Sequence, residues 1–331
     1  MSNSFSEYLF DKDYIQSRSK LRSKDCSTRL MYVENEKDQN FWTKLLGEDL
    51  LELYEFSMAN GPGCNESNVR GKFRFDRYLD KANSHAVFAL DFDHVLPNAS
   101  SRYHHFAENP FVIHTFGYNK ESLTNCVANI ICCLKSFCYT VPSDKDIEAF
   151  LSTYSSIIKL YLVKYVFLVN EGEAPYEDDD FHRFIIPSVD FIRKVFHDND
   201  WEQFEESISL AEASLDQIVA GRDLDNIDKL FRSHGMTEYN AYMFINGHKV
   251  QQLVIDTIIA EVKKELIDKA IDKAKQDGFR GSPLGTKIQE IKNHFSEECN
   301  FNTLRNSSHC LVKDDLIKKV QEQFASFTEA D

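Results

Sequence analysis

Apolar residues in the first 140 positions fall into short continuous runs separated by helix-spaced patterns. The spacing of Phe41, Trp42, Leu45 and Leu46 is typical of one face of a helix. A second helix is expected from Asn119, a favourable N-cap residue, to Cys138. The short apolar runs predict four strands, at 30–33, 50–58, 86–90 and 111–114. This alternation predicts an α/β layer with a mostly parallel sheet flanked by helices.

After residue 144 the pattern changes to long helices. Apolar positions recur at helical spacing over 147–169, 189–219 and 250–274, whereas 171–180 and 275–286 have the composition of exposed loops. We therefore divide the chain into an N-terminal helix and basic segment (1–28), an α/β core (29–140) and a mainly helical C-terminal region that completes or covers the site (141–331). The low glycine and proline content, 12 and 7 residues of 331, also argues against an all-β fold.

The net charge limits how this chain could bind a polyanion such as nucleic acid. With 38 basic and 53 acidic residues it carries −15, so its overall field repels nucleic acid and only local basic patches could bind it. The sequence offers one such patch at Arg70, Lys72, Arg74 and Arg77. A second basic run, 18–29, has the composition of a solvated helical face or of a phosphate contact.

Targeting signals and cysteines favour an intracellular protein. The longest apolar stretch, 157–169, is interrupted by Lys159 and Lys164, so no membrane span is expected. The first residues lack a basic flank and an apolar segment of the secretory type, which favours the cytoplasm. The eight cysteines are expected to be reduced core thiols without disulfides.

Carboxylates follow the predicted strands. Glu34 ends the first strand, Asp91 and Asp93 end the third, and Glu121 follows the fourth. The carboxyl ends of parallel strands meet at one sheet edge, and clustered carboxylates there need a cation or protonation. Oxygen ligands of this kind suit Mg²⁺ or Mn²⁺, and such ions can assist phosphodiester hydrolysis. The alternatives are structural, since Asp38 and Glu121 also fit the first turn of a helix and His248 fits a buried, hydrogen-bonded histidine.

Two acidic motifs together resemble those of Toprim domains. Val33-Glu34-Asn35-Glu36-Lys37-Asp38 is similar to their V-E-G-x-x-D element, and Asp91-Phe92-Asp93 is similar to their D-x-D element. The segments 115–121 and 244–248 resemble later elements of an OLD-like Toprim group that includes the AriB-type subunits of PARIS phage-defence systems. The resemblance covers roughly residues 28–260 and is strongest in the two acidic motifs.

The resemblance implies a Toprim-like nuclease. It makes Glu34 the catalytic carboxylate and His248 a second catalytic contributor, with Asp38, Asp91, Asp93 and Glu121 as ligands of Mg²⁺ or Mn²⁺. It also implies a nucleic-acid substrate, RNA, tRNA or DNA, and an AAA or ABC-type ATPase partner that controls a toxic anti-phage effector. No P-loop motif occurs in this sequence, so ATP hydrolysis would come from the partner. Whether the chain forms a homo-oligomer is left open.

Three other interpretations stay open. Asp91-Phe92-Asp93-His94-Val95-Leu96 also fits the nucleophile motif of haloacid-dehalogenase-like phosphatases, in which Asp91 would attack phosphate. Asn35 stands where Toprim domains often have glycine, which allows a non-catalytic adaptor or sensor subunit. A zinc site at His294, Cys299, His309 and Cys310 lacks the usual paired spacings, so these residues are expected to be incidental.

Overall fold

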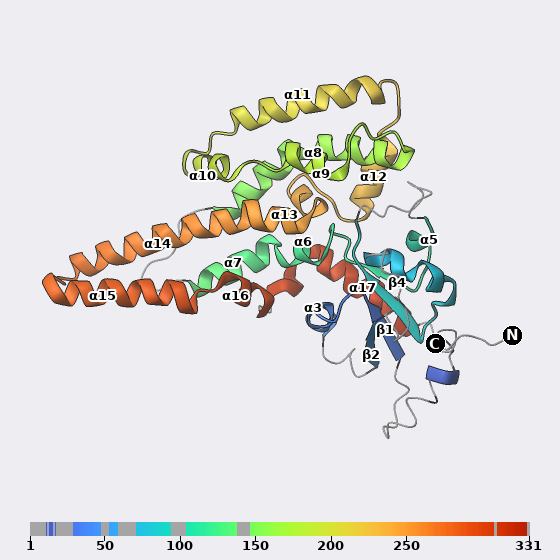
Figure 1. Cartoon of the computed structure of the whole chain (residues 1–331), viewed down its shortest axis with the longest axis horizontal. Coiled ribbons are helices and arrows are strands. Elements are labelled where there is room, and N and C mark those ends of the chain that lie inside the picture. Colours follow the sequence, from blue (N-terminus) through green and yellow to red (C-terminus); the bar gives the residue numbers. More distant parts are fainter. Residues whose placement is uncertain are drawn as a thin grey trace. The chain divides into compact units, whose positions relative to one another are not determined.

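The computed structural model describes most of the chain. The described residues are 11, 13–15, 17, 29–47, 53–58, 71–93, 104–137, 146–307 and 310–329. They form a mixed α/β protein with a four-stranded parallel sheet, flanking helices and a helical C-terminal region (Figure 1). This confirms the predicted fold class at that level.

The chain divides into two compact units. Unit 1 comprises Met1–Lys120 with Asp315–Asp331, and unit 2 comprises Glu121–Asp314. The division falls 20 residues earlier than the boundary after residue 140 suggested by the sequence pattern, and the last helix is grouped with the sheet. Unit 1 is therefore built from two separate stretches of chain.

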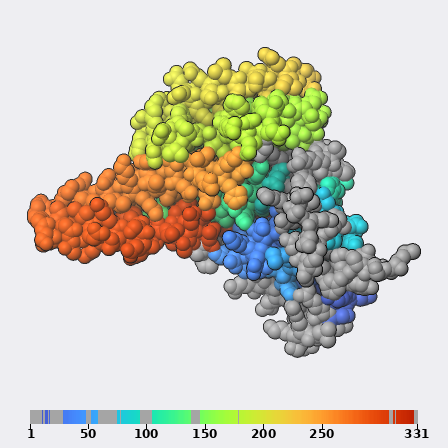
Figure 2. Space-filling view, in the orientation of Figure 1, coloured from blue at the N-terminus to red at the C-terminus, as the bar shows by residue number. Residues whose placement is uncertain are grey.

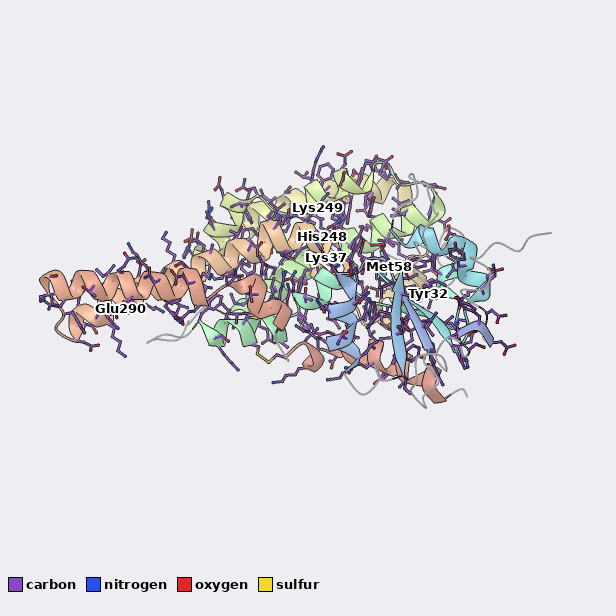
Figure 3. All side chains as sticks on the ribbon, turned by 60° about the horizontal axis from the view of Figure 1, so that its bottom comes forward. Tyr32, Lys37, Met58, His248, Lys249 and Glu290 are labelled. Atoms are coloured by element: carbon purple, nitrogen blue, oxygen red, sulfur yellow. A yellow bond between two sulfur atoms is a disulfide. The ribbon has the colours of Figure 1, made fainter. Side chains whose placement is uncertain are left out.

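The sheet of unit 1 has the strand order β2-β1-β3-β4. Its strands are β1 (Arg29–Val33), β2 (Tyr54–Met58), β3 (Ala86–Leu90) and β4 (Val112–His114), and every neighbouring pair is parallel. All five residues of β3 are buried, as expected for a parallel strand covered on both faces. Figure 3 marks Tyr32 on β1 and Met58 on β2. The four predicted strands are confirmed, the second one over a shorter range.

Helices accompany the sheet within unit 1. They are α3 (Asp38–Leu46), the 3₁₀ segment η1 (Gly71–Lys81), α5 (His104–Ala107), the first residue of α6 (Lys120–Thr124) and α17 (Asp315–Glu329). The core forms where Tyr32 stacks on Phe88, with ring centroids 5.3 Å apart, and Phe75 packs edge-on against Phe88 at 5.1 Å. These aromatic contacts join strand and helix layers that lie far apart in sequence.

The C-terminal helix α17 completes the edge of the sheet. Gln323 accepts a hydrogen bond from the His114 backbone N–H at 3.2 Å and donates one to the Val112 carbonyl at 3.0 Å. One side-chain amide thus supplies the donor and the acceptor that a further strand would offer to β4. Gln321 donates to the Leu45 carbonyl at 2.6 Å, at the end of α3. These contacts explain why α17 belongs to unit 1.

Within the described residues, the secondary-structure elements of unit 2 are all helical. Its elements are α7 (Val127–Ser136), α8 (Ile147–Glu171), α9 (Asp178–Ile185), α10 (Val189–Asp198), α11 (Glu202–Val219), α12 (Asp225–Ser233), η2 (Ala241–Phe244), α13 (Gly247–Val250), η3 (Gln251–Ile255), α14 (Asp256–Gln276), α15 (Gly281–Asn293), η4 (His294–Glu298), α16 (Phe301–Ser307) and η5 (Cys310–Lys313). Helices α14 and α15 run side by side (Figures 1 and 2). None of the described helices is long and apolar enough to cross a membrane.

The central helix of unit 2 is α8. Asp146 caps its start by accepting a hydrogen bond from the Ala149 N–H at 2.8 Å, and Gly172 ends it with a φ of 73° that favours glycine. The Lys164 side chain is only 7% exposed and forms ion pairs with Glu212 and Asp216 of α11. A buried lysine is tolerated here because two carboxylates compensate its charge.

Several predicted helices are interrupted where a side chain favours a turn. The helix expected over 189–219 breaks at Asn199, which has a φ of 54° and caps α10. The helix expected to open at Asn119 is split into α6 and α7, because Asn129 donates to the Thr124 carbonyl at 2.7 Å and thereby satisfies a backbone group at the break. The pattern over 250–274 continues as a helix but includes a π-turn, η3.

Two loop predictions are wrong in part. The segment expected as a loop over 275–286 contains the end of α14 and the start of α15, and Pro283 fits the first helical turn because its missing N–H has no partner there. The acidic segment 171–180 is a loop only over 172–177, because α9 begins at Asp178. Glycine, proline and acidic residues were compatible with helix ends as well as with loops.

The prediction that all cysteines are free thiols is also wrong. Cys132 of α7 and Cys310 of η5 form a disulfide across 178 residues of sequence. Cys126, Cys133 and Cys299 are free and buried. Sequence alone gave no indication of this pair, because the two cysteines come together only through the packing of α7 against η5.

Candidate functional site

The turn after β1 holds one pair of predicted site residues. Glu34 is the first residue beyond the strand and is half-buried. Asp38 begins α3 and is 6% exposed. Its Oδ2 accepts hydrogen bonds from the Asn35 backbone N–H at 3.0 Å and from the Asn35 side-chain amide at 3.4 Å. The turn therefore fixes the Asp38 carboxylate near a helix N-terminus, where negative charge is favourable.

The turn after β3 holds the second predicted pair, Asp91 and Asp93. The intervening Phe92 N–H donates to the Thr115 hydroxyl at 3.0 Å, and the Asp93 N–H donates to the Tyr118 carbonyl at 2.9 Å. Asp93 has a φ of 42° and Phe116 a φ of 59°, both in the left-handed region. Backbone strain of this kind persists only where the surroundings hold it, and here two loops brace each other.

Lys120 joins the two turns. Its backbone N–H donates to Asp91 Oδ1 at 3.0 Å, and its ammonium forms a short ion pair with Asp38 Oδ1. Because β1 and β3 are parallel neighbours, their carboxyl ends meet, and Lys120 contacts a carboxylate from each. Asp38 and Asp91 therefore both contact Lys120 at the carboxyl edge of the sheet. The predicted convergence of Glu34, Asp91, Asp93 and Glu121 at one edge stays a prediction.

This edge has donors suitable for a hard divalent cation. Mg²⁺ typically uses one or two protein carboxylates and keeps water or substrate oxygens for the rest. Asp38 and Asp91 would supply such carboxylates, with Glu34 and Asp93 in the same two turns. As they stand, no three His, Cys, Asp or Glu side chains of the described chain segments converge on one point. In this arrangement the Lys120 ammonium compensates the charge of Asp38.

Two predicted residues, Glu121 and His248, meet in unit 2. Glu121 Oε2 lies 3.4 Å from His248 Nε2, and their side chains are 12% and 63% exposed. His248 and the neighbouring Lys249 stand at the start of α13 (Figure 3), where Asn246 caps the helix. The structure thus brings these two residues together within unit 2. The role of His248 as a catalytic contributor stays a prediction.

A buried arginine supports the segment that carries Glu121. Arg305 of α16 is 6% exposed and donates to Asn125 Oδ1 at 2.8 Å, while the Asn125 N–H donates to the Glu121 carbonyl at 3.0 Å. Burial lowers the pKa of the Arg305 guanidinium, and the carboxylates of Asp256 and Glu121 act in the opposite direction. Arg305 therefore holds the turn between α6 and α7 from inside unit 2.

The remaining sequence candidates lie outside the described residues or take part in other contacts. Arg70 and the side chains of Lys72, Arg74 and Arg77 lie outside the described residues, as does most of the basic run 18–29. Of the zinc candidates, His294 Nε2 contacts Cys299 Sγ at 3.3 Å, His309 is outside the described residues, and Cys310 is in the disulfide.

Sequence reasoning missed Lys120. A signal was present, because Lys120 directly precedes Glu121 in the segment that resembles a Toprim element, yet only the acid was selected. The Asn35 N–H donates to Asp38 Oδ2, which is the contact expected if Asp38 serves as an acidic residue in the first turn of a helix. The non-glycine residues with positive φ in the described chain are Asp93, Phe116 and Asn199, so the turn at Asn35 does not require glycine.

Comparisons with known proteins leave the family open. No family model matches this chain, and no curated protein matches it. The assignment of function therefore depends on the geometry described above.

Proposed function

We propose that this protein is a metal-dependent nuclease of the Toprim type, which cleaves phosphodiester bonds of nucleic acid. The main support for the proposal is that Lys120 contacts the carboxylates of both Asp38 and Asp91. These carboxylates follow neighbouring parallel strands and belong to the two motifs that resemble Toprim elements. A purely structural role does not require two acidic turns braced by a strained loop at the edge where α/β proteins place their sites.

The metal would be held by Asp38, Asp91 and Asp93, with Glu34 in reach of the same edge as the acid/base group. Bound Mg²⁺ or Mn²⁺ would polarise the scissile phosphate and lower the pKa of the attacking water. Asn35 would keep Asp38 oriented through its two hydrogen bonds, and Lys120 would offer positive charge to the phosphate. The resemblance adds Glu121 as a ligand and His248 as a catalytic contributor.

The geometry at Asn35 favours an active enzyme over a non-catalytic adaptor. The adaptor interpretation depended on the loss of a glycine, but Asn35 has no positive φ and hydrogen-bonds a site carboxylate. A haloacid-dehalogenase-like phosphatase is less well supported, since that fold needs further strands after the nucleophile, and the described residues beyond β4 are helical.

The biological setting is proposed from the resemblance. The chain would be a cytoplasmic effector of an anti-phage system of the PARIS type, kept inactive by an AAA or ABC-type ATPase until infection. The acidic net charge of −15 fits this arrangement, because a partner could supply positive charge for nucleic-acid binding.

Purified protein and two variants test the activity. Wild type, Glu34→Ala and Asp91→Ala would be incubated with plasmid DNA, total RNA and a phosphomonoester, in Mg²⁺, Mn²⁺ or EDTA. We expect metal-dependent cleavage of one nucleic acid, abolished in both variants. Glu36→Ala and Asp80→Ala are controls: Glu36 is an exposed carboxylate in the turn after β1, and Asp80 is an exposed carboxylate of η1 outside both turns.

The outcomes separate the candidate functions. Phosphomonoester turnover that survives Glu34→Ala but not Asp91→Ala would establish the phosphatase instead. If neither nucleic acid is cleaved and Mn²⁺ fails to bind in calorimetry, the nuclease proposal is wrong. Circular dichroism of every variant checks that lost activity is not lost folding.

A further inference from the structure

The disulfide of unit 2 lies beside the contact that holds Arg305. It joins Cys132 of α7 to Cys310 of η5, and Arg305 of α16 comes five residues before Cys310 in the chain. The Arg305 carbonyl accepts a hydrogen bond from the side-chain amide of Asn129 on α7 at 3.2 Å. Its guanidinium donates to Asn125 Oδ1, in the turn before α7, at 2.8 Å. The bond therefore adds a covalent link on the C-terminal side of the packing between α16 and α7.

We propose that Cys132 and Cys310 form a reversible redox site whose reduction loosens α16 from α7. In the disulfide form, a covalent bond ties the chain just after α16 to α7. In the dithiol form only noncovalent contacts remain there, so local opening can separate the two helices more often. The inference concerns the thiol chemistry of unit 2 and does not rest on the proposed nuclease function.

The two bonded cysteines differ from their neighbours in access. Cys132 and Cys310 are half-buried, whereas the free thiols of Cys126, Cys133 and Cys299 are buried. A small dithiol can therefore approach the bond. Burial raises the pKa of the Cys133 thiol to about 11, so at neutral pH this thiol stays protonated and does not displace Cys132 from the bond. The pairing of Cys132 with Cys310 is thus protected from exchange with the adjacent cysteine.

Noncovalent contacts keep the two cysteines close when the bond is open. The Asn129 side chain donates to the carbonyls of Thr124 and Arg305, at 2.7 and 3.2 Å, and so links the turn before α7 to α16. Phe301, at the start of α16, is 5% exposed. Because these contacts involve neither sulfur, they can persist in the reduced protein and keep the thiols at a high effective concentration. The bond can then form again.

The loosened contact supports the segment that carries Glu121. The Asn125 backbone N–H donates to the Glu121 carbonyl at 3.0 Å, and the Thr124 hydroxyl donates to the same carbonyl at 3.1 Å. Arg305 holds the Asn125 side chain from α16. When α16 opens, Arg305 leaves this turn. The redox state of the two cysteines would therefore set how firmly unit 2 holds Glu121.

Reduction proceeds by thiol–disulfide exchange with a dithiol of the class that keeps cytoplasmic thiols reduced. One thiolate of the reductant attacks a sulfur of the bond, forms a mixed disulfide and releases the other cysteine as a thiolate. The second thiolate of the reductant then displaces the first cysteine. Two electrons pass to the protein, the reductant becomes an internal disulfide, and two protons end on the sulfurs of Cys132 and Cys310.

Hydrogen exchange followed by mass spectrometry tests the site in the full-length protein. Wild type would be compared after oxidation with diamide, after reduction with dithiothreitol, and after removal of dithiothreitol and reoxidation. In the dithiol form we expect the amides of 125–130 and 301–307 to exchange about tenfold faster or more. The amides of α8 should keep their rates, and reoxidation should restore the protection. Alkylation with N-ethylmaleimide would report the redox state of each cysteine.

Single variants separate the bond from a general effect of the reductant. Cys132→Ser and Cys310→Ser should exchange like reduced wild type and should not respond to dithiothreitol. Cys133→Ala is the matched control, because it removes the adjacent thiol that is not in the bond. It should respond to dithiothreitol as wild type does.

Three results would overturn the proposal. The first is equal exchange of 301–307 in the two redox forms, and the second is alkylation of both Cys132 and Cys310 after oxidation. The third is loss of protection in α8 together with α16 on reduction, because the bond would then stabilise the whole of unit 2 and would not act locally. None of these measurements uses nucleic acid, so they leave the nuclease proposal to its own test.

Discussion

Unit 1 and unit 2 use polar residues in different ways. In unit 2 the buried charges of Lys164 and Arg305 contact partners outside their own helices, in α11 and in the turn between α6 and α7. In unit 1 the carboxylates of Asp38 and Asp91 follow neighbouring strands, and Lys120 pairs its ammonium with Asp38 and donates its backbone N–H to Asp91. The buried charges of unit 2 thus join segments of the helical fold, whereas the carboxylates of unit 1 lie at the strand edge where we propose the site.

The largest loss of stability in unit 2 is expected from removing its buried arginine. Arg305→Met should lower the free energy of unfolding by about 3 to 5 kcal/mol, because Asp256 and Glu121 lose a compensating charge in a buried setting. Urea denaturation followed by circular dichroism measures this. Arg232→Met is the control, since that side chain is 60% exposed and its pair with Asp228 is worth about 1 kcal/mol or less. Equal losses in both variants would contradict the structural role of Arg305.

The disulfide is the next largest contribution to unit 2. Cys132→Ser should cost about 2 to 4 kcal/mol, because the bond closes a long loop in the unfolded chain. Dithiothreitol should destabilise wild type by a similar amount and leave Cys132→Ser unchanged. Burial raises the pKa of the Cys133 thiol to about 11, so iodoacetamide at neutral pH should label the reduced pair before Cys133. Labelling of Cys132 in the unreduced folded protein would contradict the bond.

In unit 1 the sharpest test concerns Lys120. Lys120→Met should lower the free energy of unfolding by about 1.5 to 3 kcal/mol without metal, since the buried Asp38 loses a charged partner. Added Mn²⁺ should restore more stability to this variant than to wild type, because a cation can replace the ammonium. Thermal unfolding with and without Mn²⁺ measures both effects. Lys37→Met, an exposed neighbour, should show neither. A variant stabilised equally with wild type would argue against a metal at this edge.

The smallest expected effect concerns the sheet edge. Gln323→Ala should cost about 1 to 2 kcal/mol, because it removes two hydrogen bonds from β4. Chemical denaturation would detect this loss, and hydrogen exchange should show faster exchange at the His114 amide. Gln289→Ala on the exposed face of α15 is the control and should change stability little. Unchanged protection of His114 would show that α17 does not complete the sheet.

Sequence predicted the strands and the position of two acidic motifs because local patterns determine them. The continuous apolar run of β3 and the acids directly after it needed no distant information. Lys120 was missed because its partner Asp38 is 82 residues away in sequence. The Cys132–Cys310 pair and the membership of α17 in unit 1 depend likewise on residues that meet only after folding.

Helix breaks were missed for a different reason. Asn199 carries the same polar character as a surface helix residue, so hydrophobic periodicity continues across it, and only its left-handed conformation ends α10. The resemblance to Toprim domains drew attention to the acidic residues. At position 35, however, this sequence has asparagine where those domains often have glycine. The hydrogen bonds from Asn35 to Asp38 explain why the turn can form without one.

The return of α17 to the sheet has a consequence for synthesis on the ribosome. Gln323 is made 209 residues after His114, the residue whose backbone it binds. At about 5 to 20 residues per second, translation needs about 10 to 40 s to cover that distance. Throughout this interval the β4 edge of the nascent chain lacks the hydrogen bonds that Gln323 supplies. In the cell, unit 1 can therefore complete its fold only after α17 has left the ribosome.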